Sequence, residues 1–447
     1  MNTPLHQPRD RNHAAAHGRG RNTARRRTLL TLADQATVSA TNFATVVIVG
    51  KACAPTEPEQ FGLYVLGLSL TFLVNEAHAA LVSTPHTVTS PRLTGERQRA
   101  FNGSTLLHQF AVSAVLAVGF VCGAGLAWLL GRADIAGVLL TLSVVGAAIG
   151  LRNYARLFCF AVRRTGSAFT LDAATSLLQV ALLLALWHAG GLHAWSALLV
   201  VGMANTVPAV LWLLPNLRHF SPRLAVARTD LLANWPLMRW VFVSGALWTL
   251  GMYLYPWAIE GLRDTAAVAA WGAAFTVANV GNPILLGLQN VVGPSIAFAW
   301  TEAATPADFR GYVLKAAGQF VAAMVPVALV LGLSASWLLG GLFGEPFAAY
   351  GTTVALLAAA TVVQACGFTL SRGLFALGRA DLDTLTNVAP LVVLLTAGVW
   401  LIVQHGPTGA AASLLIAQLA ATTLRAGFFL SVTRRPATAP TLTRSVA

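Results

Sequence analysis

Three carboxylic acids lie inside long apolar stretches of the sequence, where an ionised side chain is costly. They are Asp34, Glu76 and Asp172, and such residues usually face a water-filled cavity or a charged partner. Glu76 suits a functional carboxylate in a cavity, with a structural ion pair as the alternative. Asp34 lies about one turn from the expected membrane surface, so a side chain that extends to the headgroups, or an arginine partner, explains it equally well.

Two arginines four positions apart, Arg152 and Arg156, share one face of an expected helix. Two guanidinium groups in this arrangement suit bidentate binding of phosphate. For either arginine taken alone, contact with lipid headgroups or a role in setting the membrane orientation is the simpler explanation. The pair is therefore a candidate ligand for a phosphorylated substrate.

Several amides and tyrosines also fall within apolar stretches. Asn42 follows Asp34 by close to two turns and is predicted on the same helical face. Asparagines in membrane helices more often form hydrogen bonds between helices than bind ligands. The remaining candidates for a polar cavity are two tyrosines beside Pro256 and three asparagines near Pro283: Tyr253, Tyr255, Asn279, Asn282 and Asn290.

The patterns of soluble enzymes and metal sites are absent from the sequence. Neither lysine, Lys51 or Lys315, closes a GxxxxGK phosphate loop, which argues against an ATPase motor. The 4 cysteines are far apart and have no CxxC or Cys/His spacing, so no metal, cofactor or disulfide framework is predicted. The outer connections between apolar stretches are too short for an enzyme site, so no enzyme activity is expected.

The composition is that of a chain whose main solvent is lipid. Of the 447 residues, 56% are hydrophobic and only 10% are charged, against roughly 25% charged in soluble domains. The net charge of +13 does not indicate nucleic acid, because the basic residues lie between apolar stretches. About 20 mainly apolar residues span a bilayer. Twelve stretches qualify, which predicts an all-α membrane protein: 29–50, 61–84, 104–130, 135–154, 168–188, 194–214, 240–259, 266–292, 313–339, 347–370, 385–403 and 409–430.

The basic residues predict how the chain crosses the membrane. With the N-terminus inside, all but three of the 29 lysines and arginines fall in inner segments, the exceptions being Lys51, Arg132 and Arg263. Such a bias is typical of cytoplasmic segments, so both termini are expected in the cytoplasm. The longest inner connection then divides the stretches six and six. The expected parts are a disordered basic cytoplasmic tail (1–28), an N-terminal half (29–214), a cytoplasmic linker (215–239), a C-terminal half (240–431) and a second tail (432–447).

A weak internal repeat supports this division. The segment from Gly62 to Pro85 in the second stretch is similar to that from Gly272 to Pro294 in the eighth, and an acidic outer turn precedes each. Repeated halves are common in transporters, with the substrate site at their interface. Chance similarity between two apolar helices is the alternative.

Several short motifs follow one another in a familiar order along nearly the whole chain. They are Leu32 to Phe43; Glu59-Gln60-Phe61-Gly62-Leu63-Tyr64; Ser83-Thr84-Pro85 leading to Pro91-Arg92; Leu151 to Arg156 with the later Asp172; and Asn279 to Pro283 running to Pro294. Each motif is loose, but their order resembles that in bacterial polysaccharide flippases of the Wzx type. These belong to the multidrug/oligosaccharidyl-lipid/polysaccharide exporter (MOP) superfamily.

The resemblance implies a MATE-like fold of two six-helix halves in the bacterial inner membrane. Undecaprenyl-pyrophosphate-linked oligosaccharide would enter between the halves from the cytoplasm and be translocated by alternating access, for lipopolysaccharide or exopolysaccharide assembly. Arginines would hold the pyrophosphate, and amides and aromatics the sugar. The intramembrane carboxylates would couple the cycle to a proton or sodium gradient. Arginines at mid-membrane, which some related lipid flippases have, are missing here.

The implied partners are this lipid-linked oligosaccharide, membrane lipids, and a polysaccharide polymerase with chain-length proteins. Two alternatives remain open. A multidrug/cation antiporter of the same superfamily would have a cavity dominated by carboxylates and aromatics. A non-transporting scaffold of the polysaccharide assembly machinery would have a polar interior without a continuous cavity.

Overall fold

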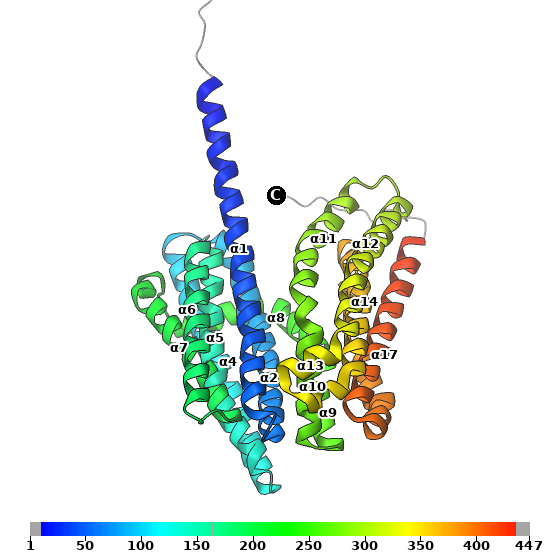
Figure 1. The fold of residues 1–447 in the computed structure, drawn as a ribbon. Helices are drawn as coiled ribbons and strands as arrows, with labels where there is room; N and C mark the ends of the chain where they lie inside the picture. The colour runs from blue at the N-terminus through cyan, green and yellow to red at the C-terminus, as the bar shows by residue number, and fades with distance from the viewer. Residues whose placement is uncertain (1–9, 163, 435–447) are drawn as a thin grey trace, which may run out of the picture.

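The computed structural model of the 447-residue chain describes residues 10–162 and 164–434. For residues 10–29, and for Leu32, Asn290 and Val291, only the backbone is described. The described chain is helical almost throughout (Figure 1). The expected tail segments 1–9 and 435–447 lie outside the described residues.

The N-terminal half contains six long helices. Several begin with favourable terminal residues, such as Pro58 in the first turn of α2. The last part of α2 continues through a wide π-helical turn, η1, into the short helix α3. The elements are α1 (Asp10–Cys53), α2 (Pro58–His78), η1 (Ala79–Ser83), α3 (Thr84–Thr89), η2 (Ser90–Arg92), α4 (Gly95–Leu129), α5 (Ala133–Ala161), α6 (Thr165–His188), α7 (Ala194–Asn216) and η3 (Leu217–His219).

The C-terminal half is built from more, and shorter, elements. Its best-defined start is that of α12, where the Thr305 hydroxyl accepts from the Asp308 amide and the Asp308 carboxylate accepts from the Thr305 amide. The elements are α8 (Leu224–Tyr253), α9 (Tyr255–Leu262), α10 (Thr265–Ala278), η4 (Asn279–Gly281), α11 (Asn282–Glu302), α12 (Pro306–Leu333), α13 (Ala335–Phe343), η5 (Glu345–Tyr350), α14 (Gly351–Ala376), α15 (Ala380–Thr386), α16 (Ala389–Val393), η6 (Leu394–Gly398) and α17 (Val399–Arg434).

The described helices account for the predicted membrane crossings. Ten helical segments are long and apolar enough to cross a bilayer, and the pair α8–α9, bent by 45°, makes 11. The segment Ala380–Arg434 counts once in that number, yet it reverses at Gly406, whose φ of +55° suits glycine. A Cβ on Gly398 would lie 2.6 Å from Ser413 Oγ, so the chain on either side of the reversal packs side by side. The two arms of this hairpin correspond to the last two predicted stretches, and the predicted all-α membrane fold is confirmed.

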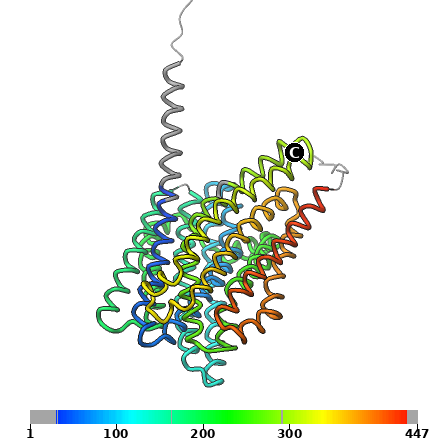
Figure 2. The backbone as a smooth tube through the Cα atoms, turned by 45° about the vertical axis from the view of Figure 1, so that its right-hand side comes forward, coloured from blue at the N-terminus to red at the C-terminus, as the bar shows by residue number. Residues whose placement is uncertain are grey.

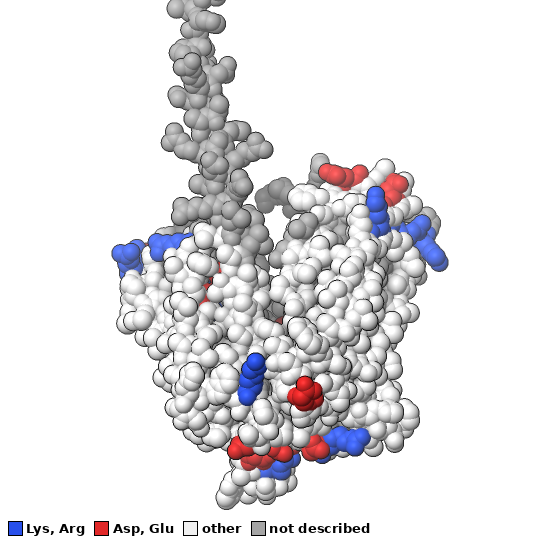
Figure 3. Space-filling model, viewed as in Figure 1, with Lys and Arg blue, Asp and Glu red and all other residues white. Residues whose placement is uncertain are grey.

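The two halves stand side by side, and α1 begins and α17 ends at the top of Figure 1, here called the terminal end. The opposite end, where α9 lies, is called the distal end. Gly406 belongs to the distal end, since a Cβ on it would lie 4.0 Å from Nε of Arg263, the residue after α9. The helices of the two halves diverge toward the terminal end in Figure 1, and Figure 2 shows the long helices running between the two ends of the molecule. Charged side chains on the face in Figure 3 gather toward the two ends, and a furrow separates the halves.

The distal halves of the bundles pack closely against each other. A Cβ on Gly62 of α2 would lie 2.0 Å from the backbone oxygen of Thr265, and one on Gly272 of α10 would lie 2.2 Å from Val65 Cγ2. Both positions therefore need the smallest side chain. The rings of Phe61 and Phe343 stack beside this contact, with centroids 5.5 Å apart. One large apolar core joins both halves here.

Three sequence-based boundaries differ from the structure. Residues 224–239 of the expected linker belong to α8, and the Arg97 guanidinium bonds to Asp230 there at 2.5 Å, which attaches this segment to the N-terminal half. The ninth stretch, expected to reach Leu339, ends at Leu333 because α13 is a separate helix. The distal connection 334–350 is therefore not short. α1 begins at Asp10, within the segment expected to be disordered.

Candidate functional site

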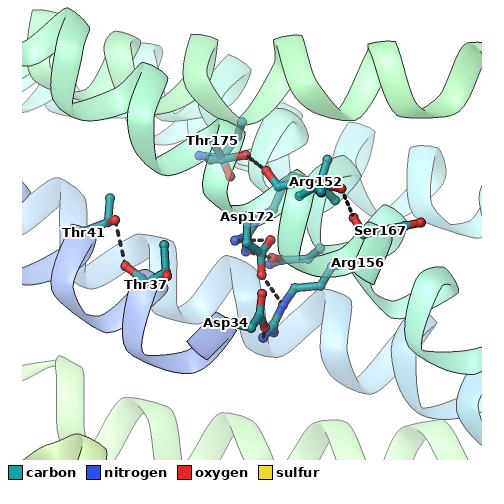
Figure 4. A network of polar contacts seen from close by, with 12 residues as sticks. Asp34, Thr37, Thr41, Arg152, Arg156, Ser167, Asp172 and Thr175 are labelled. Carbon is teal, nitrogen blue, oxygen red and sulfur yellow. Dashed lines mark hydrogen bonds and ion pairs between the residues drawn. The ribbon is translucent and has the colours of Figure 1, made fainter. Parts of the chain in front are cut away.

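Four charged residues that the sequence assigned to different roles form one buried network in the N-terminal half. Arg156 Nε donates to Asp172 Oδ2 at 2.7 Å and its Nη2 donates to Asp34 Oδ2 at 2.6 Å. Arg152 Nη2 lies 2.6 Å from Asp172 Oδ1. Asp172 is 0% exposed and Asp34 is 1% exposed. Figure 4 shows the side chains converging from α1, α5 and α6.

A tight turn between two antiparallel helices creates this network. α5 and α6 are joined around Arg164, and Arg156 and Asp172 are equally far from it in the sequence. Antiparallel neighbours connected by a short turn bring such positions to the same depth, since each helix rises by the same amount per residue. Asp34 of α1 reaches the network because α1 packs along α6.

The charges in this network balance, with two guanidinium groups and two carboxylates. Buried charges are tolerated when they are paired in this way, and removing one partner leaves an uncompensated charge. In this conformation a phosphate could reach Arg152 or Arg156 only by competing with Asp34 and Asp172. The predicted phosphate role of the two arginines therefore depends on first releasing a carboxylate.

A line of amides extends the network toward the interface between the halves. Arg152 Nη1 donates to Asn153 Oδ1 at 3.1 Å, and Asn153 Nδ2 donates to Asn75 Oδ1 at 2.7 Å. Asn75 of α2 precedes Glu76, the carboxylate predicted to lie in a cavity. Hydrogen-bonded side chains therefore connect the charged network to Asn75, the neighbour of Glu76.

Glu76 faces the other half of the protein. A Cβ on Gly245 of α8 would lie 1.8 Å from Glu76 Oε1, so the Glu76 side chain can hold this position only because residue 245 is glycine. One turn earlier on α2, the ring of Phe72 stacks on Tyr253, with centroids 4.0 Å apart. Trp248 and Phe275 meet Tyr253 edge-on. Glu76 and, one turn away on α2, a cluster of four aromatic rings therefore lie where the two halves meet.

The other predicted site residues do not gather in one place. Asn42 is exposed, whereas Asp34, expected on the same face of α1, is buried. Tyr255 is fully buried in the C-terminal half, where it bonds to Ser413 at 3.2 Å and stacks on Trp271. Asn279 Nδ2 donates to the Phe275 carbonyl at 2.8 Å.

A small cavity with several amide side chains in its lining lies inside the C-terminal half. Asn279 lines it together with Gln364 and Gln418, and its volume is about 20 Å³, close to the space that one water molecule occupies. Asn282 begins α11 and is partly buried. The side chain of Asn290 lies outside the described residues.

The C-terminal half has its own buried ion pair. Arg425 Nε of α17 donates to Asp383 Oδ1 at 2.9 Å and Nη2 donates to Asn387 Oδ1 at 2.6 Å. Asp383 and Asn387, both 5% exposed, lie in and just after α15. Ser244 of α8 lies within 3.5 Å of Asn387 Nδ2. The sequence carries no signal for this pair, because its members come from different helices.

The turns beside the two ion pairs share one geometry. Arg164 N donates to Cys159 O at 2.7 Å, and Arg379 N donates to Leu374 O at 2.9 Å. The φ and ψ angles of Arg164 are −91° and 59°, and those of Arg379 are −106° and 49°. Asp172 and Asn387 follow these two arginines at the same spacing, and each bonds to an arginine. This correspondence supports the two-half repeat independently of the α2 similarity.

A larger cavity lies at the terminal end of the C-terminal half. Its volume is about 490 Å³, and its lining includes Gln289 and Gly293 of α11 and Arg372 and Phe375 of α14. The guanidinium of Arg372 lies over the ring of Phe368, 4.5 Å from its centroid. Among the described residues, no ion pair with a carboxylate involves Arg372. No group of three or more His, Cys, Asp or Glu within the described chain is arranged to hold a metal.

Comparisons with known proteins give a fold but no sequence family. No protein-family model matches the sequence. No curated protein matches it significantly.

Solved structures are similar over nearly the whole chain. An inward-facing multidrug-resistance MATE transporter of the MOP superfamily matches with a TM-score of 0.75 and 14% identity, covering 89% of this chain and 94% of its own. A MOP-superfamily transporter from Pyrococcus furiosus matches at 0.63 with 13% identity, covering 91% and 95%. The lipid II flippase MurJ, in an inward closed conformation, matches at 0.65 with 10% identity, covering 91% and 89%. The chain therefore has the MATE-like, all-helical membrane fold of these MOP-superfamily structures.

Proposed function

We propose that this protein transports a lipid-linked oligosaccharide, with an undecaprenyl-pyrophosphate anchor, across the bacterial inner membrane for surface polysaccharide assembly. The observation that carries this proposal is an asymmetry between the two ends. The distal ends of the halves are packed together at Gly62 and Gly272, while a cavity with an arginine lies at the terminal end. A bundle closed at one end and polar at the other suits alternating access. The solved lipid II flippase with the same fold adds a precedent for a lipid-linked cargo.

The terminal end would face the cytoplasm, in agreement with the distribution of basic residues. Lipid-linked substrate would enter there, with its lipid tail remaining in the bilayer. This role would require enzymes that assemble the lipid-linked oligosaccharide on the cytoplasmic side of the membrane and enzymes that polymerise it on the opposite side. A polysaccharide polymerase and chain-length proteins are the partners that this role implies.

The N-terminal network supplies a way to couple transport to a proton. Asp34 and Asp172 hold Arg156 through hydrogen bonds of 2.6 and 2.7 Å. A proton added to either carboxylate removes its charge and weakens its hold on the guanidinium. The freed guanidinium can then bind a phosphate oxygen. In this scheme the two carboxylates act as the coupling groups and the two arginines as substrate ligands, and Glu76 at the interface between the halves is a second coupling site.

Transport of a fluorescent lipid-linked oligosaccharide into proteoliposomes tests the proposal. The parent protein should move the sugar across the membrane faster than empty liposomes, and Asp34→Asn or Glu76→Gln should slow it at least tenfold. Arg379→Gln serves as the matched control, because Arg379 pairs with Asp381 at the surface, outside the network. A parent protein that leaves the sugar where it started, while passing the same folding checks, would refute the proposal.

One observation favours the antiporter alternative. Glu76 follows Phe72 by one turn of α2, and the ring of Phe72 stacks on Tyr253 at the interface between the halves. A carboxylate and aromatic rings on one interface suit an organic cation. Transport of a labelled organic cation in the same proteoliposomes separates the two candidates. Saturable, Glu76-dependent cation transport without oligosaccharide movement would establish the antiporter.

A further inference from the structure

Arg372, the exposed arginine at the terminal-end cavity, differs from the arginines of the two ion-pair networks. Arg152, Arg156 and Arg425 are each within 3 Å of a carboxylate oxygen. Arg372 is held instead by the faces of two phenylalanines, with its guanidinium carbon 4.5 Å from the Phe368 centroid and 5.8 Å from the Phe375 centroid. Such stacking fixes the plane of the guanidinium without using its N–H donors.

The nearest acidic influence on Arg372 comes from a carboxylate that is already bonded. Asp383 acts on Arg372 through space, but its Oδ1 accepts from Arg425 at 2.9 Å. Within the part of the chain that the structure describes, Arg372 therefore has no carboxylate bonded to it, because the Asp383 carboxylate is paired with Arg425. The network of the N-terminal half has two carboxylates for its two arginines. The guanidinium of Arg372 lines the cavity without such a partner.

The cavity beside Arg372 offers a second polar group and sufficient room. Gln289 of α11 lines it on the side opposite α14, and its amide can donate to an oxygen anion. Gly293 lies nearest to the arginine, where a Cβ would be 3.8 Å from Arg372 Nε, so α11 leaves the guanidinium accessible. A volume of about 490 Å³ lies within the usual range for small-ligand sites.

We propose that Arg372 and Gln289 form a subsite for a phosphoryl anion attached to a lipid. A stacked guanidinium with free donors suits bidentate contact with phosphate oxygens, and the adjacent amide supplies a further donor. The anion comes either from the pyrophosphate of an isoprenyl-linked cargo or from a phospholipid headgroup. The first source rests on the proposed function, and the second does not.

Binding of isoprenyl ligands to the purified full-length protein in a phosphate-free maltoside detergent tests this subsite. The probes are farnesyl pyrophosphate, farnesyl phosphate and the neutral alcohol farnesol. The parent protein should bind farnesyl pyrophosphate at least tenfold more tightly than farnesol. Arg372→Gln should remove most of that preference, and Arg372→Lys should retain part of it, because the charge remains while the planar fork is lost.

Two further variants separate local binding from general damage. Gln289→Leu should weaken farnesyl pyrophosphate binding several-fold without changing the net charge. Arg379→Gln removes the same charge as Arg372→Gln near the same end of α14, but at a surface pair with Asp381, and should leave binding within twofold. Equal binding of pyrophosphate and alcohol by the parent, or parent-like binding by both Arg372→Gln and Gln289→Leu, would overturn the subsite.

A parallel titration with phosphatidylglycerol and with uncharged diacylglycerol identifies the source of the anion. Tighter, Arg372-dependent binding of farnesyl pyrophosphate than of phosphatidylglycerol supports a subsite for the cargo. Equal Arg372-dependent binding of both supports a subsite for resident phospholipid. Failure of oligosaccharide transport in proteoliposomes would refute the proposed function without altering either binding result, so the two proposals fail separately.

Discussion

Arg132 and Glu260 form an ion pair that joins the two halves of the protein at its distal end. Arg132 lies in the turn between α4 and α5, and its Nη2 donates to Glu260 Oε1 of α9. The same carboxylate oxygen accepts from Thr265 at 3.1 Å, and Glu260 is buried. The pair lies beside the close contacts of Gly62 and Gly272, so it should stabilise the state in which the distal end is closed.

Neutralising Glu260 should favour opening of the distal end. In Glu260→Gln the interaction with the Arg132 charge is lost, and we expect the distal-open population to rise roughly tenfold, as for loss of a charge-assisted hydrogen bond. The reporter is Val65→Cys, a buried position against Gly272, in a background in which the 4 native cysteines are replaced. The measurement is its rate of reaction with a polar thiol reagent in nanodiscs.

Two variants check this interpretation. Asp134→Asn removes the other partner of Arg132, which lies in the same half, and should leave the labelling rate near the parent value. Exchange of the two charges, Arg132→Glu with Glu260→Arg, should restore slow labelling. Slow labelling in Glu260→Gln itself would show that the ion pair does not hold the halves together.

Asp172→Asn should destabilise the N-terminal half strongly. Asp172 is fully buried and contacts both Arg152 and Arg156, and leaving buried charges without a partner costs about 3–5 kcal/mol. The measurement is the midpoint of thermal unfolding in detergent, which should fall by several degrees. Asp381→Asn, in an exposed pair, is the control and should leave the midpoint unchanged. Equal midpoints for the two variants would contradict the structural role of the network.

The Arg425–Asp383 pair should show strong coupling in a double-mutant cycle. Each single change, Arg425→Met or Asp383→Asn, leaves one buried charge unpaired and should lower stability. The double variant removes both charges, so its loss should be smaller than the sum of the two by about 1–3 kcal/mol. Unfolding of the four proteins under identical conditions gives the coupling. Strict additivity would mean that the two side chains do not interact in the folded protein.

Alanine at two interface glycines should have different effects because different atoms stand in the way. In Gly62→Ala the new Cβ meets the Thr265 backbone oxygen at 2.0 Å, which cannot move without shifting α10, so a loss of about 1–3 kcal/mol is expected. In Gly245→Ala it meets the end of the Glu76 side chain, which can rotate away. Stability should then change little while Glu76-dependent transport falls.

Thermal unfolding compares these variants with Gly119→Ala, a helical site with nothing within 4 Å of a Cβ. There alanine should be neutral or slightly stabilising. A loss for Gly62→Ala no greater than that for Gly119→Ala would show that the distal contact tolerates a methyl group.

The architecture was largely predictable because membrane helices are encoded locally. Length, apolarity and the bias of basic residues each depend on neighbouring residues alone, so the number of crossings follows from the sequence. The predicted helix boundaries differ from the structure at two places. α8 extends into the expected linker because Asp230 and its neighbours pack on the N-terminal half, and α13 separates from α12 at Ser334 although both are apolar.

The candidate site was only partly predictable because its contacts join distant segments. Residue type alone singled out Asp34, Arg156 and Asp172. That they form one hydrogen-bonded network depends on how α1 packs on α6. The α5–α6 pairing had a sequence signal, since Arg156 and Asp172 are equidistant from the turn. The Arg132–Glu260 pair had no signal in the sequence, because the segments that carry these residues meet only when the two halves pack together.

The π-helical turn Ala79–Ser83 constrains the length of the chain in this region. It contains one residue more than an α-helical turn would, so the helix beyond it is rotated by about 100° relative to an unbroken helix. Glu76, before the turn, contacts α8, while His86, after it, bonds to Asn102 of α4. Loss of one residue between Glu76 and His86 would give an ordinary α-helical turn and leave both side chains directed as they are, whereas gain of one residue would rotate one of them toward the wrong neighbour. Homologous chains should therefore differ in this spacing only by the loss of that one residue.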